Sequence, residues 1–83
     1  MAVEKLSVYY ANRSMCHIKM ENYGLSLNDG LESVKLNKDY VKAYYRVGSA
    51  SIVLGKVREA YDAFVKVIVA RSRRLSLEDE RTR

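Results

Sequence analysis

The chain has 83 residues, 48% of them apolar and 30% charged, which predicts one small folded domain rather than a disordered tail. Its formal net charge of +5 is dispersed, so it lacks the concentrated basic stripe with interleaved aromatic residues that is typical of nucleic-acid binding. One cysteine, Cys16, excludes an internal disulfide and a cysteine-based metal cage, and no apolar run approaches the roughly 18 residues of a membrane span.

These features also bear on the compartment in which the protein works. A single cysteine suits a reducing environment. The first ten residues, "MAVEKLSVYY", lack the apolar core of a secretory signal. We therefore expect the protein in the cytoplasm, with the nucleus as the alternative.

The first half of the chain predicts two helices separated by a break at "ENYG", residues 21–24. Apolar or small residues recur at helical spacing on both sides of the break. They are Tyr10, Met15, Cys16 and Ile18 before it, and Leu25, Leu27, Leu31 and Val34 after it.

The second half predicts two more helices, over 41–54 and 57–70, with Gly55 between them as a helix stop. "LNKD" at 36–39 separates the two pairs, and Asp39 is a candidate N-cap for the third helix. The expected inward faces are Tyr44, Val47, Ala50, Ser51 and Leu54 in one helix, and Val57, Ala60, Tyr61, Phe64, Val67 and Ile68 in the other.

Similar residues recur at an interval of 34. The large residues at this interval are Tyr10 and Tyr44, and Ile18 and Ile52. The small residues at this interval are Ser14 and Gly48, Cys16 and Ala50, and Ser26 and Ala60. A helix–turn–helix unit of 34 residues is the signature of the tetratricopeptide repeat. The predicted fold is all-α, a right-handed superhelical fragment divided into an N-terminal segment (1–7), two repeats (8–40 and 41–70) and a charged C-terminal segment (71–83) that caps, extends the last helix or frays.

The first helix of each unit carries a second stripe of residues, separate from the packing face. It consists of Val8, Asn12, Met15 and Lys19 in the first unit, and of Lys42, Arg46, Ser49 and Val53 in the second. Asn12 and Arg46 are 34 residues apart, so stacked repeats would set them side by side. Lys42 and Arg46 lie one turn apart near the start of a helix, where a bound anion would be stabilised. Asn12, Lys42 and Arg46 are therefore a candidate carboxylate receptor, the alternative being that both cations form a solvated helix face.

Three stretches resemble the tetratricopeptide region of the serine/threonine protein phosphatase 5 family. They are "YYANRS" at 9–14, "ENYGLSLND" at 21–29 and "DYVKAYYRVGSASIVLGKVREA" at 39–60, and the resemblance covers roughly residues 8–70. Other co-chaperones of the carboxylate-clamp class share the Asn-Arg and Lys-x-x-x-Arg elements.

The resemblance implies a peptide-binding function. Asn12, Lys42 and Arg46 would belong to a clamp that binds the C-terminal aspartate of heat-shock chaperones ending Met-Glu-Glu-Val-Asp. The expected partner is the C-terminal peptide of the ninety-kilodalton heat-shock chaperone, or of the seventy-kilodalton one. Three further residues would line the groove beside the clamp, namely Met15, Lys19 and Ser49.

The resemblance also predicts what the chain does not contain. Family members carry an earlier repeat with another basic residue and another asparagine, and this chain begins where their second repeat begins. We therefore expect half of the clamp to be absent. We also expect either a marginally stable monomer or self-association through the face around Val8 and Tyr9, with helix exchange as one route. In the parent protein the module would also cover the phosphatase active site and restrain it. A two-metal site needs several His and Asp ligands and this chain has one His, so we expect no catalysis, no metal and no cofactor.

Three single residues deserve a prediction of their own. Cys16 and His17 diverge by about a hundred degrees on a helix and cannot form a nucleophile–base pair, so Cys16 is predicted to be a small packing residue and His17 a partly buried one. "RRLS" at 73–76 resembles sites of basophilic kinases, which makes Ser76 a candidate phosphorylation site.

Two rival functions stay open at this point. One is a purely structural or oligomerisation module without a peptide site, and the other, less favoured, is a basic module that contacts nucleic acid through 71–74. Within the clamp class, the chain could also belong to a co-chaperone other than the phosphatase.

Overall fold

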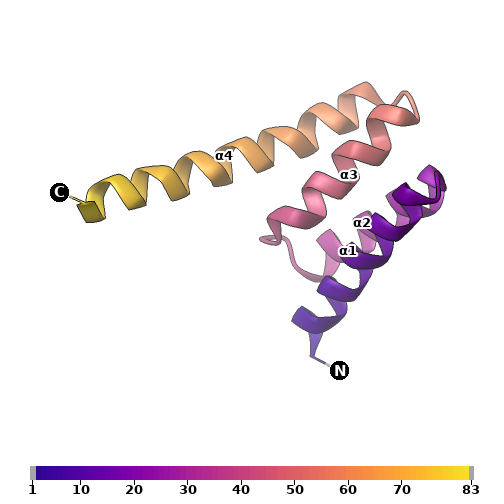
Figure 1. The fold of residues 1–83 in the computed structure, drawn as a ribbon, viewed down its shortest axis with the longest axis horizontal. Helices are drawn as coiled ribbons and strands as arrows, with labels where there is room; N and C mark the ends of the chain where they lie inside the picture. Colours follow the sequence, from indigo (N-terminus) through magenta and orange to yellow (C-terminus); the bar gives the residue numbers. More distant parts are fainter. Residues whose placement is uncertain (1, 83) are drawn as a thin grey trace.

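The protein is all-α. The structure, a computed structural model, describes residues 2–82, and side chains for residues 2–77. The four helices are α1 (Val3–Lys19), α2 (Tyr23–Leu36), α3 (Val41–Val53) and α4 (Val57–Thr82), and the described residues contain no strand. They form two antiparallel pairs, α1 with α2 and α3 with α4, and α3 also packs on α2 and α1 (Figure 1). The expected all-α repeat architecture is therefore confirmed.

The turns inside the two pairs have the same geometry, 34 residues apart. Glu21 has φ 61° and Gly55 has φ 76°, both in the left-handed region. At each turn one amide bonds three residues back and the next bonds five back: Glu21 to Ile18 and Asn22 to His17, then Gly55 to Ile52 and Lys56 to Ser51. These pairs of bonds form a Schellman motif, which satisfies the last carbonyls of the helix. Gly55 is a helix stop, as expected.

Serines join the first pair of helices at short range. Ser7 Oγ donates to the Ser33 carbonyl at 2.9 Å, and Ser33 Oγ returns a bond to the Ser7 carbonyl at 2.7 Å. About two helical turns further along α1, Ser14 Oγ donates to the Ser26 carbonyl at 2.7 Å. All four side chains are fully buried, so small size lets the backbones approach and each hydroxyl finds an acceptor.

The second pair packs through a glycine and an aromatic ring. A Cβ on Gly48 would lie 2.7 Å from the tip of the Phe64 ring, so the ring occupies the space that a side chain would need. The two pairs meet at Gly30, where a Cβ would lie 2.9 Å from Cγ2 of Val47. The small hydrophobic core consists of Leu27, Val47, Ala50 and Ala63.

Several residues expected on the inward faces are instead exposed: Leu54, Val57, Tyr61 and Ile68. Those predictions were wrong. On α2 the buried face is made of small and polar residues with Leu27, and on α4 it runs through Ala60 and Ala63. Helical spacing shows which residues share a face, but whether that face is buried depends on a neighbouring helix.

Two local predictions also fail. Asp39 is not the N-cap of α3, because the helix begins after Tyr40, whose side chain makes no capping hydrogen bond, and the Asp39 amide donates to Asn37 Oδ1 instead. Cys16 is exposed rather than packed. It lies two positions after the buried Ser14, about 200° around the helix, so it points away from α2.

α4 has 26 residues, so the segment after Ala70 extends the last helix, which was one of the three expected outcomes. It continues as one helix through 71–82, beyond the level at which α3 begins (Figure 1). No Gly or Pro interrupts this stretch, so nothing in the backbone ends the helix at Ala70.

Candidate functional site

The expected clamp residues lie on the first helix of each pair. Asn12 is exposed on α1, Lys42 is exposed in the first turn of α3, and Arg46 is half-buried one turn later. The Arg46 guanidinium donates to Met15 Sδ at 3.2 Å, which brings an expected clamp residue and an expected groove residue together across α1 and α3. Neither Asn12 nor Lys42 makes a hydrogen bond with any side chain that the structure describes.

The electrostatics at this place are unbalanced. The ion pairs of Arg13 and His17 both use Asp29, and no described carboxylate forms an ion pair with Lys42 or Arg46. A thioether sulfur is a weak acceptor for a guanidinium. The first amides of α3 also lack a side-chain cap, which adds a positive field beside Lys42. The site is thus a cationic surface with unused donors.

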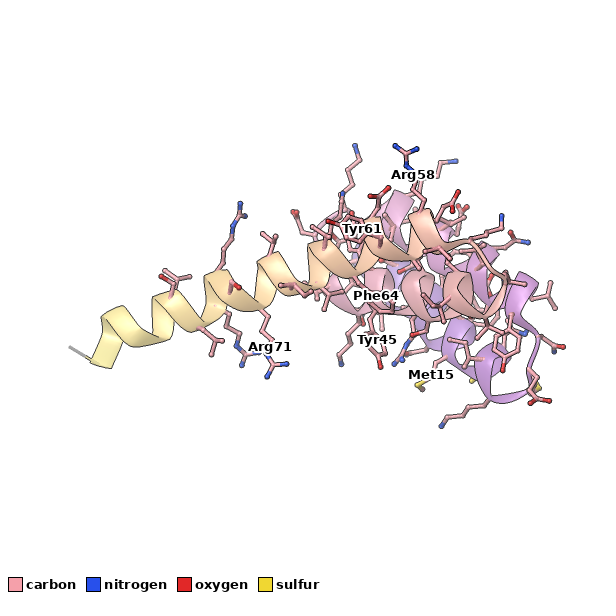
Figure 2. The ribbon with its side chains drawn as sticks, turned by 90° about the horizontal axis from the view of Figure 1, so that it is seen from above. Met15, Tyr45, Arg58, Tyr61, Phe64 and Arg71 are labelled. Carbon is pink, nitrogen blue, oxygen red and sulfur yellow. The ribbon has the colours of Figure 1, made fainter. Side chains whose placement is uncertain are left out.

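The remaining expected groove residues flank this surface. Ser49 Oγ donates to the Tyr45 carbonyl at 2.9 Å, so its hydrogen is used within α3. Lys19 is exposed at the end of α1. The Arg46 guanidinium lies 5.5 Å from the centre of the Tyr45 ring, and this ring meets the Phe64 ring edge-on with 6.0 Å between their centres. Figure 2 shows Met15 and Tyr45 on one side of the molecule, with Arg58 on the opposite side.

A second polar cluster was not anticipated from the sequence. Arg13 on α1 forms a bidentate ion pair with Asp29 on α2, at 2.7 Å to Oδ2 and 2.8 Å to Oδ1, and donates to the Tyr9 hydroxyl at 3.0 Å. These bonds, the Asp29 one above all, raise the pKa of Arg13 above its ordinary value, although partial desolvation opposes the rise. The cluster joins the two helices and is structural, since its charges are already paired.

His17 completes this cluster. It is half-buried, as expected, and its Nε2 lies 3.5 Å from Asp29 Oδ2. Its buried Nδ1 has no hydrogen-bond partner among the described residues. In the part of the chain that the structure describes, no group of His, Cys, Asp or Glu side chains is arranged to hold a metal ion.

One hollow lies between Val41 of α3 and the middle of α4, and none of the expected clamp residues lines it. Its volume is about 490 Å³ and its walls come from Val41 and the second half of α4. Arg71 and Arg74 line it, whereas Arg73 lines a different hollow of about 290 Å³. The basic tail is therefore divided between two surfaces. Ser76 is exposed on α4, and its phosphorylation stays a prediction.

No family model matches the chain, but individual proteins do. Human serine/threonine-protein phosphatase 5 is 41% identical over 64 residues, which are 74% of this chain and 13% of the phosphatase. Heat shock protein STI1 of Saccharomyces cerevisiae is 38% identical over 61 residues, 74% of this chain and 10% of that protein. Among solved structures, the second tetratricopeptide domain of Spaghetti (RPAP3), bound to the HSP90 peptide SRMEEVD, superposes with a TM-score of 0.75 and 33% identity over 76% of this chain and 58% of that one.

The chain is a tetratricopeptide repeat module. It is similar to the tetratricopeptide regions of these proteins and fits the carboxylate-clamp co-chaperone class. The module is a protein-interaction fold without catalytic function, and it is not a phosphatase catalytic domain. It spans only a small part of the length of the curated relatives. No helix in the described part of the module has the length and apolarity needed to cross a bilayer.

Proposed function

We propose that the module binds the acidic C-terminal peptide of a heat-shock chaperone, with Lys42 and Arg46 gripping the terminal carboxylate and Asn12 orienting it. The supporting observation is that Arg46 is half-buried yet has only the Met15 sulfur as a hydrogen-bond acceptor among the described residues. A carboxylate would replace this weak contact by charge-assisted bonds. Lys42, one turn earlier and beside uncapped amides, would add a second positive group.

The solved relative supports this choice of ligand. The second tetratricopeptide domain of Spaghetti (RPAP3) is bound to the HSP90 peptide SRMEEVD. That peptide ends in aspartate and carries two further glutamates, which matches a surface with Lys42 and Arg46 and no described neutralising carboxylate. Met15, Lys19 and Ser49 are proposed to line the rest of the groove.

Isothermal titration calorimetry with SRMEEVD tests the proposal. The free acid should bind at least about tenfold more tightly than its C-terminally amidated form, because charge-assisted bonds to the carboxylate are lost on amidation. The double variant Lys42→Ala/Arg46→Ala should remove this difference. The control is Lys35→Ala/Arg58→Ala, which removes the same net charge from exposed positions on α2 and α4 and should keep it. Equal binding of acid and amide to the unaltered protein would refute the clamp.

The alternative of a structural module is favoured by one observation. Val57, Tyr61 and Ile68 on α4 are 67%, 68% and 63% exposed, and they form an apolar stripe. If assembly were the whole function, SRMEEVD would not bind, and association would depend on this stripe or on the face around Val8 and Tyr9.

We further propose a regulatory role where the module is joined to a phosphatase. As in the expectation from the sequence, the module would cover the catalytic domain, and the chaperone peptide would release it. Adding the isolated module to the catalytic domain of human serine/threonine-protein phosphatase 5 should then lower its activity, and SRMEEVD should restore it. Unchanged activity would exclude this role.

A further inference from the structure

The hollow between α3 and the second half of α4 has a composition suited to a peptide. It is lined by Val41, Val67, Ala70 and Leu75, which are apolar, and by the guanidinium groups of Arg71 and Arg74. Val41 and Leu75 are both exposed, so apolar surface faces water there. Arg71 makes no hydrogen bond or ion pair with the side chains that the structure describes.

The hollow and the clamp share one helix, because Val41, which lines the hollow, belongs to α3. Val41 directly precedes Lys42 in α3. From Arg46 a series of rings leads across to α4, since Arg46 lies over Tyr45 and Tyr45 meets Phe64. Arg71 follows Phe64 by seven residues, which is nearly two full turns, so both project from the same side of the helix. Figure 2 shows Arg71 pointing to the side on which Tyr45 and Met15 lie, and Arg58 pointing the other way.

We propose that this hollow is a second subsite for the same acidic peptide, with Arg71 pairing with an acidic side chain upstream of the terminal carboxylate. An apolar neighbour of that side chain would rest on Val41, Val67 and Leu75. This inference rests on the proposed clamp function and names a specificity residue for it. Charge complementarity and continuity with the clamp identify the occupant.

The spacing sets which peptide residue reaches Arg71. Phe64 lies at the level of Tyr45, the neighbour of Arg46, and the seven residues of helix from Phe64 to Arg71 span about 10 Å. An extended peptide chain advances about 3.3 Å per residue, so three residues cover the same length. An acidic side chain about three positions before the terminal residue therefore falls at the level of Arg71. SRMEEVD has a glutamate three positions before its aspartate, preceded by a methionine that suits the apolar lining.

A double-mutant cycle tests this pairing. The unaltered protein and Arg71→Ala are each titrated with SRMEEVD and with SRMQEVD, both carrying a free carboxylate. Arg71→Ala should weaken SRMEEVD binding about two- to fivefold, as for an exposed ion pair, and should leave SRMQEVD binding nearly unchanged. Alanine keeps the helix, which circular dichroism would verify. Arg58→Ala, which removes the same charge from the opposite side, should leave both affinities as they were.

The outcomes separate the two proposals. If Arg71→Ala weakens both peptides equally, or neither, the subsite is wrong, while a retained preference for free acid over amide keeps the clamp. If neither free-acid peptide binds the unaltered protein, the clamp and the subsite both fail.

Discussion

At the scale of single residues, one arginine in each repeat differs from the other in how many hydrogen-bond partners its guanidinium has. Each of the three nitrogens of the Arg13 guanidinium donates a bond, two to Asp29 and one to Tyr9, and the rings of Tyr9 and Tyr10 lie 5.2 and 5.3 Å away. Arg46 has one sulfur acceptor and one ring. The first arginine therefore holds the fold together, and the second is left to bind a ligand.

Asp29→Asn should lower the melting temperature by roughly 5 °C, because a nearly buried carboxylate that accepts two guanidinium bonds is replaced by a neutral amide. Arg13→Lys should also destabilise, since an ammonium cannot bond both oxygens in the same way. The raised pKa of Arg13 means that its contribution is present at lower pH and is lost only above the ordinary arginine range. The Arg13 charge thus contributes equally from pH 6 to 9 in thermal melts.

Asp62→Asn is the control for this prediction, because Asp62 is exposed on α4 and its substitution removes the same charge. An equal loss of stability in Asp29→Asn and Asp62→Asn would contradict the structural role of Asp29.

At the scale of elements, the two turns carry the same conformation with different residues. Gly55 adopts its positive φ without steric cost, but Glu21, at the equivalent position, has a Cβ. The first hairpin is therefore strained at Glu21, whereas the second hairpin avoids this strain by having Gly55 at the equivalent position.

Glu21→Gly should raise the free energy of unfolding by about 1 kcal/mol, since the left-handed conformation costs an ordinary residue about 1–2 kcal/mol. Urea denaturation would measure it. Glu21→Ala removes the same carboxylate but keeps the Cβ, so it should not be more stable than the natural protein. Equal stability of the two variants would show that the turn is unstrained.

Gly30 and Gly24, both in α2, provide a matched pair for the packing between hairpins. A Cβ at Gly30 would lie 2.9 Å from Val47 and 3.4 Å from its backbone nitrogen, while a Cβ at Gly24 meets no atom within 4 Å. Gly30→Ala should destabilise by about 1 kcal/mol, because overpacking outweighs the gain in helix propensity. Gly24→Ala should be neutral or stabilising in the same denaturation experiment.

At the scale of the whole molecule, the protein measures 46 × 33 × 20 Å and has open apolar faces at both ends of the stack. Val3, Val8 and Tyr9 on α1 are exposed at one end, and the stripe of Val57, Tyr61 and Ile68 at the other. Repeats are stabilised by covering such faces with a neighbour. Self-association through the face around Val8 and Tyr9 therefore stays our prediction.

Sedimentation velocity should show an average mass that rises with concentration. Val8→Asp should shift the protein towards monomer, because a charge in an apolar contact is costly. Asn28→Asp changes an exposed position on α2 by the same charge and should not. A monomer at every concentration of the natural protein would rule the prediction out.

The periodic part of this structure could be predicted from sequence, and the contacts between helices could not. Helical spacing found both pairs of helices, the 34-residue interval found the small residues Ser14 and Ser26, and Gly55 marked the turn between α3 and α4. Helical spacing misplaced Leu54 and Tyr61, because it does not say which face another helix covers. The pairing of Arg13 with Asp29 joins residues 16 apart, and it depends on how one helix is rolled against the other.

The candidate site shows the same division. The stripe of Asn12, Lys42 and Arg46 could be found by spacing, since each residue projects from a regular helix. The sulfur contact of Arg46 and the hollow beside Val41 could not be found by spacing, because they depend on how α1, α3 and α4 pack together. The α4 helix extends beyond residue 70 because no Gly or Pro ends it there.

The unbroken length of α4 has a consequence for protection against amide exchange. Its first half lies against α3 through Ala60 and Ala63, but every described side chain from Arg71 onward is exposed. Deuterium should therefore enter the backbone of 71–77 by local opening well before it reaches 60–67. One continuous helix would thus contain a slow-exchanging and a fast-exchanging half, and a ligand seated against Arg71 would slow the fast one.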